Sequence, residues 1–259
     1  MRPATLVLLT ILCGPAAAAV RTETVEYRHG ETVLEGFVAW DDSTQQRRPG
    51  ILVIHEWTGQ GEYVQSRAKK LAALGYVAFA LDMYGKGVRP ASPKDAGAEA
   101  AKYKNERGLM RTRAKAGLEV LRKHPLCDPK RIAAIGYCFG GTCALELARA
   151  GEDIVGVVSF HGGLATPTPE DAKNIRAKVL VLHGADDPHV PPKEVAAFED
   201  EMRSAGVDWQ LVAYGRAVHA FTNPASGNDN SRGAAYNAAA DRRSWQAMRT
   251  FFDEVFGSG

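Results

Sequence analysis

A cysteine lies at the centre of the clearest chemical motif in the sequence. The run Gly136-Tyr137-Cys138-Phe139-Gly140-Gly141 follows an apolar stretch at 132–135 and opens a helical pattern at 140–150. A nucleophile elbow, the sharp strand-to-helix turn that exposes a nucleophile, needs this setting and residues without bulky side chains. The start of the helix adds N–H donors and a positive field that favours a thiolate. Cys138 is therefore a candidate nucleophile, and the alternative is a buried structural cysteine in a glycine-rich turn.

Two aspartates follow another buried apolar run, 178–182. They lie in the loop His183-Gly184-Ala185-Asp186-Asp187-Pro188-His189-Val190-Pro191. In hydrolases with a nucleophile elbow, the acid that orients the base comes after the nucleophile in the chain. Asp186 and Asp187 both fit that place, and the alternative is a pair of loop acids that only cap or turn. We expect His183 to be a turn residue and His189 to be exposed.

A histidine completes the set. His219 lies between the last strand pattern, 209–214, and the last helix pattern, 234–255. A single loop histidine is most often without a catalytic role. Its place after the cysteine and the acids gives the order nucleophile, acid, base. Hydrolases that use a nucleophile elbow have this order along the chain. The three signals together predict nucleophilic catalysis by a thiol with a histidine base.

Strand and helix patterns alternate along most of the chain. Two strand patterns, 22–27 and 32–40, flank a turn at 28–31, and buried apolar runs then alternate with amphipathic helices. This order predicts an α/β fold with a mostly parallel central sheet, an N-terminal antiparallel hairpin and helices on both faces. We expect further strands at 51–54, 76–81, 132–135, 154–160, 178–182 and 209–214. We expect helices at 61–74, 94–122 with a break at Gly108, 140–150, 192–205 and 234–255.

The composition is that of a globular protein. The chain has 259 residues, of which 45% are hydrophobic and 24% charged, and this excludes disordered and collagen-like classes. Its 32 basic and 30 acidic residues leave a net charge of +2, without the basic excess of a nucleic-acid or membrane-surface binder. Neither zinc-ligand spacing nor a G-x-G-x-x-G turn after the first strand is present, so we expect no metal or organic cofactor.

The first nineteen residues have the layout of a secretory signal peptide. A basic start, an apolar run at 4–12, Gly14-Pro15 and four alanines at 16–19 follow one another. The apolar run is too short to span a bilayer. We expect cleavage near Ala19, export to the periplasm or beyond, no membrane association afterwards, and a single domain over 20–259. A cytosolic start that is merely apolar is the alternative, and Leu12 before Cys13 does not suit a lipoprotein site.

Three cysteines would remain after cleavage: Cys127, Cys138 and Cys143. An odd number leaves at least one thiol unpaired within the chain. A bridge between Cys127 and Cys143 stays open. A thiol-redox protein using Cys138 and Cys143 is an alternative function, although a C-x-x-C motif is absent and a five-residue spacing suits a disulfide poorly.

These motifs together resemble the dienelactone hydrolase family of α/β-hydrolases, over residues 25–256. The resemblance is carried by the runs 54–59 (IHEWTG), 81–87 (LDMYGKG), 136–141 (GYCFGG), 184–187 with Val190-Pro191, and 219–221 (HAF). It implies an α/β-hydrolase fold and a carboxylic ester hydrolase of the carboxymethylenebutenolidase type. Because the family's acid stands three residues beyond the loop glycine and before a Val-Pro pair, the resemblance selects Asp187.

The resemblance also implies roles for residues around the cysteine. Glu56 would lie near the thiol, restrain it at rest and help to take its proton when substrate arrives, which matters because only a few per cent of a free thiol is ionised at neutral pH. The backbone N–H groups of Trp57 and Phe139 would form an oxyanion hole. Such donors typically contribute about 3–4 kcal/mol each.

Substrate recognition departs from the family pattern. Where the resemblance implies two arginines for a substrate carboxylate, this sequence has Lys86 and Asn223. A lysine keeps the charge without the bidentate fork, and Arg89 or Arg216 could compensate. We therefore expect a small ester or lactone as substrate. A non-catalytic ligand-binding protein on the same fold and a peptidase are the alternatives. Side chains that could line the pocket are Trp57, Tyr84, Phe139, His161 and Phe221.

Overall fold

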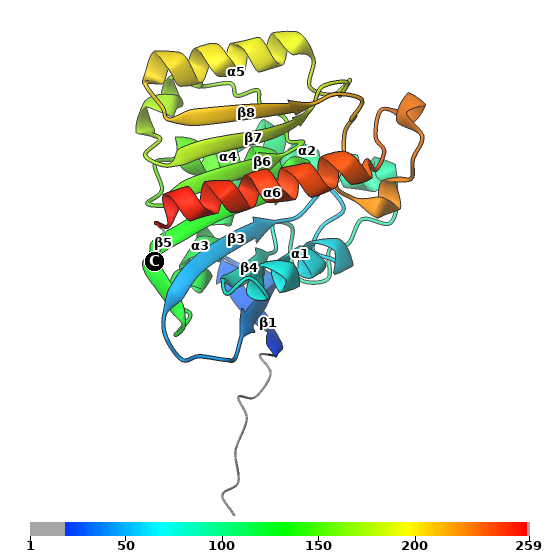
Figure 1. Cartoon of the computed structure of the whole chain (residues 1–259). Helices are drawn as coiled ribbons and strands as arrows, with labels where there is room; N and C mark the ends of the chain where they lie inside the picture. The colour runs from blue at the N-terminus through cyan, green and yellow to red at the C-terminus, as the bar shows by residue number, and fades with distance from the viewer. Residues whose placement is uncertain (1–18, 258–259) are drawn as a thin grey trace, which may run out of the picture.

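The computed structural model describes residues 19–257 of the chain (Figure 1). The predicted signal peptide, with Cys13, falls outside the described residues apart from Ala19. None of the helices in the described part is both long and apolar enough to cross a bilayer.

One mixed sheet organises the described residues. Its strand order is β1-β2-β4-β3-β5-β6-β7-β8, in which β1–β2 and β2–β4 pair antiparallel and every later pair is parallel. The predicted parallel sheet with an N-terminal antiparallel hairpin is confirmed. The strands are β1 (Val20–His29), β2 (Thr32–Asp41), β3 (Arg48–Ile54), β4 (Val77–Leu81), β5 (Cys127–Tyr137), β6 (Gly156–Phe160), β7 (Lys178–Gly184) and β8 (Trp209–Tyr214).

Helices cover both faces of this sheet (Figure 1). On one side lie α1 (Glu62–Ala72) and α6 (Ala238–Val255); on the other lie α2 (Pro93–Asn105), α3 (Arg107–Arg122), α4 (Phe139–Arg149) and α5 (Pro192–Ala205). Strand β3 shows why: Ile51 and Val53 pack into one core, whereas Leu52 and Ile54 pack into the other. Successive side chains of a strand point to opposite faces, so a strand in which all of them are apolar is buried on both faces.

The helix break expected at Gly108 is in fact at Glu106. Glu106 has φ −119° and ψ 77°, and it both ends α2 and precedes α3, whereas Gly108 lies inside α3. Tyr103 of α2 and Met110 of α3 pack into the same core. Packing therefore sets the break, and the helix accepts a glycine whose intrinsic cost is about 1 kcal/mol.

The last helix begins at Ala238 rather than near Ala234. The side chain of Asn237 accepts a hydrogen bond from the Ala240 N–H and caps the helix. Residues 233–235 instead run beside His219: the His219 N–H donates to the Gly233 carbonyl at 3.2 Å, and the Ala235 N–H donates to the His219 carbonyl at 3.0 Å. The difference matters because these bonds hold the candidate base. Short 3₁₀ turns also occur at η1 (Pro169–Asn174), η2 (Pro224–Ser226) and η3 (Asn230–Arg232).

Candidate active site

Cys138 occupies a strained turn between β5 and α4. Its φ of +54° is uncommon for a residue with a side chain, and such a conformation costs on the order of 1–3 kcal/mol unless the surroundings enforce it. The flanking glycines show the enforcement. A Cβ on Gly136 would overlap the backbone of Gly140, and one on Gly140 would overlap the carbonyl of Ile54. The turn therefore closes only with glycine at these positions.

The histidine ring joins the cysteine to an aspartate. The His219 Nε2 lies 3.0 Å from the Cys138 Sγ, and the His219 Nδ1 lies 2.8 Å from the Asp187 Oδ2. Asp187 is only 4% exposed, and its other oxygen accepts the His189 N–H at 2.8 Å. Asp186 is exposed. Of the two candidate acids, Asp187 is the one in contact with the candidate base, His219.

The electrostatics of His219 favour its charged form. Burial by itself lowers the pKa of this imidazole, but the charge of Cys138 and hydrogen bonds with Asp187 and Cys138 outweigh burial and raise the pKa to about 10. An imidazolium at neutral pH stabilises a neighbouring thiolate. The arrangement can hold a thiolate–imidazolium pair.

The loop after β3 is fixed by a histidine that the sequence reasoning did not assign a role. The His55 ring donates from Nδ1 to the Glu56 carbonyl at 2.6 Å, and its Nε2 accepts the Met83 N–H at 3.1 Å. Full burial lowers the pKa of His55 to about 4, so the ring is neutral. The Tyr84 hydroxyl donates to the Trp57 carbonyl at 2.9 Å. His55 lies inside the 54–59 motif, and this position is the sequence signal that could have identified it.

The two predicted oxyanion donors are free to bind. Among the described residues, neither the Trp57 N–H nor the Phe139 N–H has a hydrogen-bond acceptor. Trp57 follows β3 and Phe139 follows β5. These two strands pair in parallel up to Ile54 and Gly136, so the segments that follow them lie side by side at the cysteine. An N–H left unpaired beside a candidate nucleophile can stabilise a developing oxyanion.

Glu56 is buried and held by Asn223. The Asn223 side-chain amide donates to the Glu56 Oε2 at 2.6 Å, and the Asn223 Oδ1 accepts the Ala225 N–H at 3.0 Å. Burial raises the pKa of Glu56, opposed by that hydrogen bond and by the charges of His219 and Arg67. In the part of the chain that the structure describes, Asn223 is the hydrogen-bond partner of this carboxyl, and Cys138 is not.

Comparison with known proteins decides the family. The model of the dienelactone hydrolase family matches residues 34–256. The chain belongs to the dienelactone hydrolase family. It is 37% identical to the uncharacterised protein K02A2.1 of Caenorhabditis elegans over 58% of this chain and 96% of that protein. It is 27% identical to protein usf of Aquifex pyrophilus over 90% of this chain and 98% of that protein.

A solved structure supports the same assignment. The crystal structure of P91, a dienelactone hydrolase-like promiscuous phosphotriesterase from metagenomic libraries, is 41% identical and has a TM-score of 0.88. The match covers 92% of this chain and all of that chain, 100%. The protein is a dienelactone hydrolase-like hydrolase with an α/β-hydrolase fold.

The predicted substrate-binding residues of this dienelactone hydrolase-family protein lie in several environments. Lys86 forms ion pairs with Glu26 and Glu35 of the N-terminal hairpin. Asn223 is engaged with Glu56, as described above. Tyr84 is buried and supports the Trp57 loop.

Two further predicted pocket residues are buried. Phe221 is fully buried and packs in the core beneath α6, and His161 is 1% exposed. The Phe139 ring is also buried, whereas Trp57 is 38% exposed. Of the aromatic side chains proposed for the pocket, the structure brings Trp57 to the surface.

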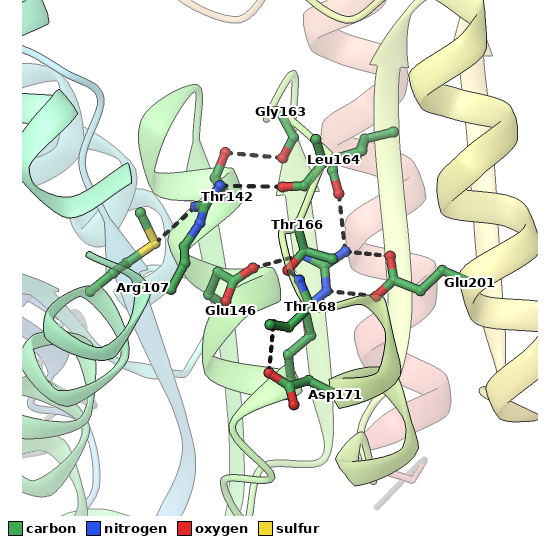
Figure 2. Close-up of polar contacts among 12 residues, drawn as sticks. Arg107, Thr142, Glu146, Gly163, Leu164, Thr166, Thr168, Asp171 and Glu201 are labelled. Atoms are coloured by element: carbon green, nitrogen blue, oxygen red, sulfur yellow. Dashed lines mark hydrogen bonds and ion pairs between the residues drawn. The ribbon is translucent and has the colours of Figure 1, made fainter. Parts of the chain in front are cut away.

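A buried ion network holds the segment after β6 against α4 (Figure 2). The Arg149 guanidinium donates to Glu201 through two bonds of 2.7 Å, to Glu146 at 3.0 Å and to the Leu164 carbonyl at 3.0 Å. Figure 2 labels the three residues that accept these bonds. The Thr142 hydroxyl donates to the Gly163 carbonyl at 3.0 Å. These hydrogen bonds hold the segment that follows β6 beside the cysteine turn of this dienelactone hydrolase-family protein.

The cysteines do not form a bridge in the described part of the chain. Cys127, Cys138 and Cys143 are all free, and Cys127 and Cys143 are buried. Burial raises the pKa of Cys127 to about 12 and that of Cys143 well above its usual value. These two thiols are poor nucleophiles, unlike a thiol in contact with His219. Within residues 19–257, no group of three or more His, Cys, Asp or Glu side chains could hold a metal ion.

Proposed function

We propose that the protein hydrolyses small carboxylic esters or lactones through a thioester on Cys138. The observation that carries this proposal is the single imidazole that reaches the Cys138 Sγ at 3.0 Å and the Asp187 carboxylate at 2.8 Å. A thiol-redox protein needs a second reactive thiol nearby, and the buried Cys143 does not supply one. A non-catalytic binding protein would not need this hydrogen-bonded series.

In the acylation half-reaction, the Cys138 thiolate attacks the substrate carbonyl carbon. The carbonyl oxygen becomes an oxyanion between the N–H groups of Trp57 and Phe139. The intermediate collapses to a thioester as the bond to the leaving oxygen breaks. His219 gives that oxygen its proton, and Asp187 stabilises the ring in the orientation required.

Deacylation uses the same groups in reverse. His219, now neutral, takes a proton from a water molecule, and the resulting hydroxide adds to the thioester carbonyl. Collapse releases the carboxylic acid and returns the thiolate beside the imidazolium. Glu56 would take the thiol proton when Cys138 is protonated, which its burial and raised pKa favour.

The first test is an ester assay with a matched cysteine control. Initial rates are measured with p-nitrophenyl acetate and with a dienelactone, for the wild type, Cys138→Ala and Cys143→Ala. We expect Cys138→Ala to lose at least about a thousandfold in kcat, and Cys143→Ala to keep activity within about twofold. A Cys138→Ala protein as active as the wild type would remove the nucleophile and favour the binding-protein alternative.

The comparison of the dienelactone with the acetate ester tests whether the site binds a negatively charged substrate. Lys86 is paired with Glu26 and Glu35, and Asn223 carries no charge, so neither of these two positions offers a free cation to a substrate carboxylate. We expect the neutral acetate ester to be the better substrate by kcat/KM. A dienelactone turned over faster would assign carboxylate binding to another group, such as Arg89 or Arg216.

Phosphotriester hydrolysis is a second candidate. It is favoured by the 41% identity to P91, a promiscuous phosphotriesterase. A thiolate can attack phosphorus as it attacks carbon, and two N–H donors can stabilise the negative charge that develops on the phosphoryl oxygen. A p-nitrophenyl phosphotriester in the same plate tests it, and loss of that activity in Cys138→Ala is the expected result.

A further inference from the structure

His161 directly follows β6 and lies beneath the cysteine turn. Its φ is +41°, a left-handed conformation that a residue with a side chain adopts only where the surroundings enforce it. Its N–H donates to the Leu182 carbonyl at 2.8 Å, which ties the turn to β7. At 1% exposure the ring cannot touch a substrate.

The hydrogen bonds of the ring fix its tautomer. The Cys138 backbone N–H is shared between the Phe160 carbonyl at 3.0 Å and the His161 Nδ1 at 3.1 Å. Because Nδ1 accepts this N–H, the ring proton is on Nε2 and is donated to the Thr222 Oγ1 at 2.7 Å. The Thr222 hydroxyl also shares a hydrogen bond of 2.6 Å with the Tyr63 hydroxyl, in which either oxygen can donate.

Thr222 belongs to the loop of the candidate base. It lies three residues after His219, and it is fully buried. Its carbonyl accepts the Arg67 guanidinium at 2.6 Å, and Arg67 forms an ion pair with Asp241 at 2.8 Å. Helices α1 and α6 therefore fix the loop end of this connection.

We propose that His161 is a positioning residue that links the backbone of Cys138 to the loop of His219 through Thr222, and so sets the separation of the Cys138 Sγ and the His219 Nε2. The ring joins the two loops that must meet for acyl transfer, although it contacts neither reacting atom. This inference rests on the proposed function.

The charges around the ring suit a permanently neutral imidazole. The titratable and charged groups around it are His219, whose ring centroid is 5.4 Å away, Tyr137 at 6.1 Å and Arg67; the Tyr63 hydroxyl is reached through Thr222. Burial, followed by the positive charges of His219 and Arg67, lowers the pKa of His161 well below its usual value. His161 therefore keeps Nδ1 as an acceptor while His219 carries a proton.

Substitutions can separate the two ends of the link. Thr222→Val removes the hydroxyl that receives the Nε2–H. His161→Asn keeps an acceptor near the Nδ1 position but cannot reach Thr222, and His161→Leu removes both contacts. Ser244→Ala is the matched control, because it removes one hydrogen bond of another fully buried hydroxyl, to the Asp241 carbonyl within α6. Activity on p-nitrophenyl acetate is measured across pH, with thermal unfolding alongside.

We expect Thr222→Val to lower kcat about tenfold and to change KM less than about twofold. The acid limb of its kcat/KM profile should move up by about one pH unit, because a wider separation weakens the thiolate–imidazolium pair. His161→Leu should lose about a hundredfold in kcat, with His161→Asn in between. Ser244→Ala should keep the wild-type pH profile.

Unchanged kcat and pH profiles in Thr222→Val and His161→Leu, with only a lower Tm, would overturn the proposal. Should His161→Leu fail to fold, Thr222→Val decides. Cys138→Ala in the same plate separates the two hypotheses: if it stays active, the proposed function fails. If it is inactive while Thr222→Val matches the wild type, only the positioning role fails.

Discussion

At the scale of single residues, Asp187 combines two hydrogen bonds with one charge. One of its oxygens contacts His219 and the other accepts the His189 N–H. Asp187→Asn keeps the size but removes the charge and can present a donor to the ring. We expect kcat for p-nitrophenyl acetate to fall by about 10³–10⁴-fold. The exposed neighbour provides the control, since Asp186→Asn should stay within about twofold, and equal losses in both variants would contradict the assignment.

Glu56 is a residue whose charge opposes folding. Because burial raises its pKa above the usual 4.5, the folded state binds more protons than the unfolded state as pH rises through that value. The contribution of Glu56 to the free energy of unfolding therefore falls from pH 4 to pH 7. Glu56→Gln keeps an acceptor for Asn223, and its gain in Tm over the wild type should be larger at pH 7 than at pH 4.

Activity should change in the opposite direction. We expect Glu56→Gln to lower kcat by about tenfold or more, as for loss of a positioned proton acceptor. Thermal unfolding at both pH values, together with the ester assay, checks this pair of effects. Glu62→Gln, at an exposed position on α1, is the control. A Tm difference that does not depend on pH would show that the carboxyl is not the cause.

At the scale of elements, Arg149 connects α4, α5 and the segment after β6. Arg149→Met would leave Glu201 and Glu146 buried beside an apolar side chain, and breaking such a network costs about 3–5 kcal/mol. We expect urea unfolding to show that loss. Adding Glu201→Leu should recover part of it. Arg203→Met, which breaks an exposed pair with Asp200, should cost at most about 1 kcal/mol.

Element boundaries show what local patterns can and cannot predict. The range 192–205 was predicted as a helix and is α5, because a proline start and a glycine end frame its apolar spacing. The break at Glu106 was predicted at Gly108, since propensity alone points to the glycine. His183 was expected in a turn but lies in β7, because the strand continues two residues beyond its apolar run.

At the scale of the whole molecule, chain order carried most of the information about the site. Cys138, Asp187 and His219 could be proposed because each follows a recognisable strand pattern. The partners of Asn223 and His161 could not. Asn223 reaches Glu56 across 167 residues of sequence, and His161 reaches Thr222 across 61. Such contacts depend on which strands become neighbours and on rotamers, neither of which leaves a local pattern.

The sheet order places the candidate base at the margin of the structure. The cysteine follows the central strand β5, whereas His219 follows β8, whose far edge has no strand partner among the described residues. Edge strands exchange their amide hydrogens through local opening more readily than central ones. Ester hydrolysis should therefore disappear at a lower urea concentration than tryptophan fluorescence or circular dichroism changes. The protein would become inactive when the β8 edge of the sheet opens, while most of its fold persists.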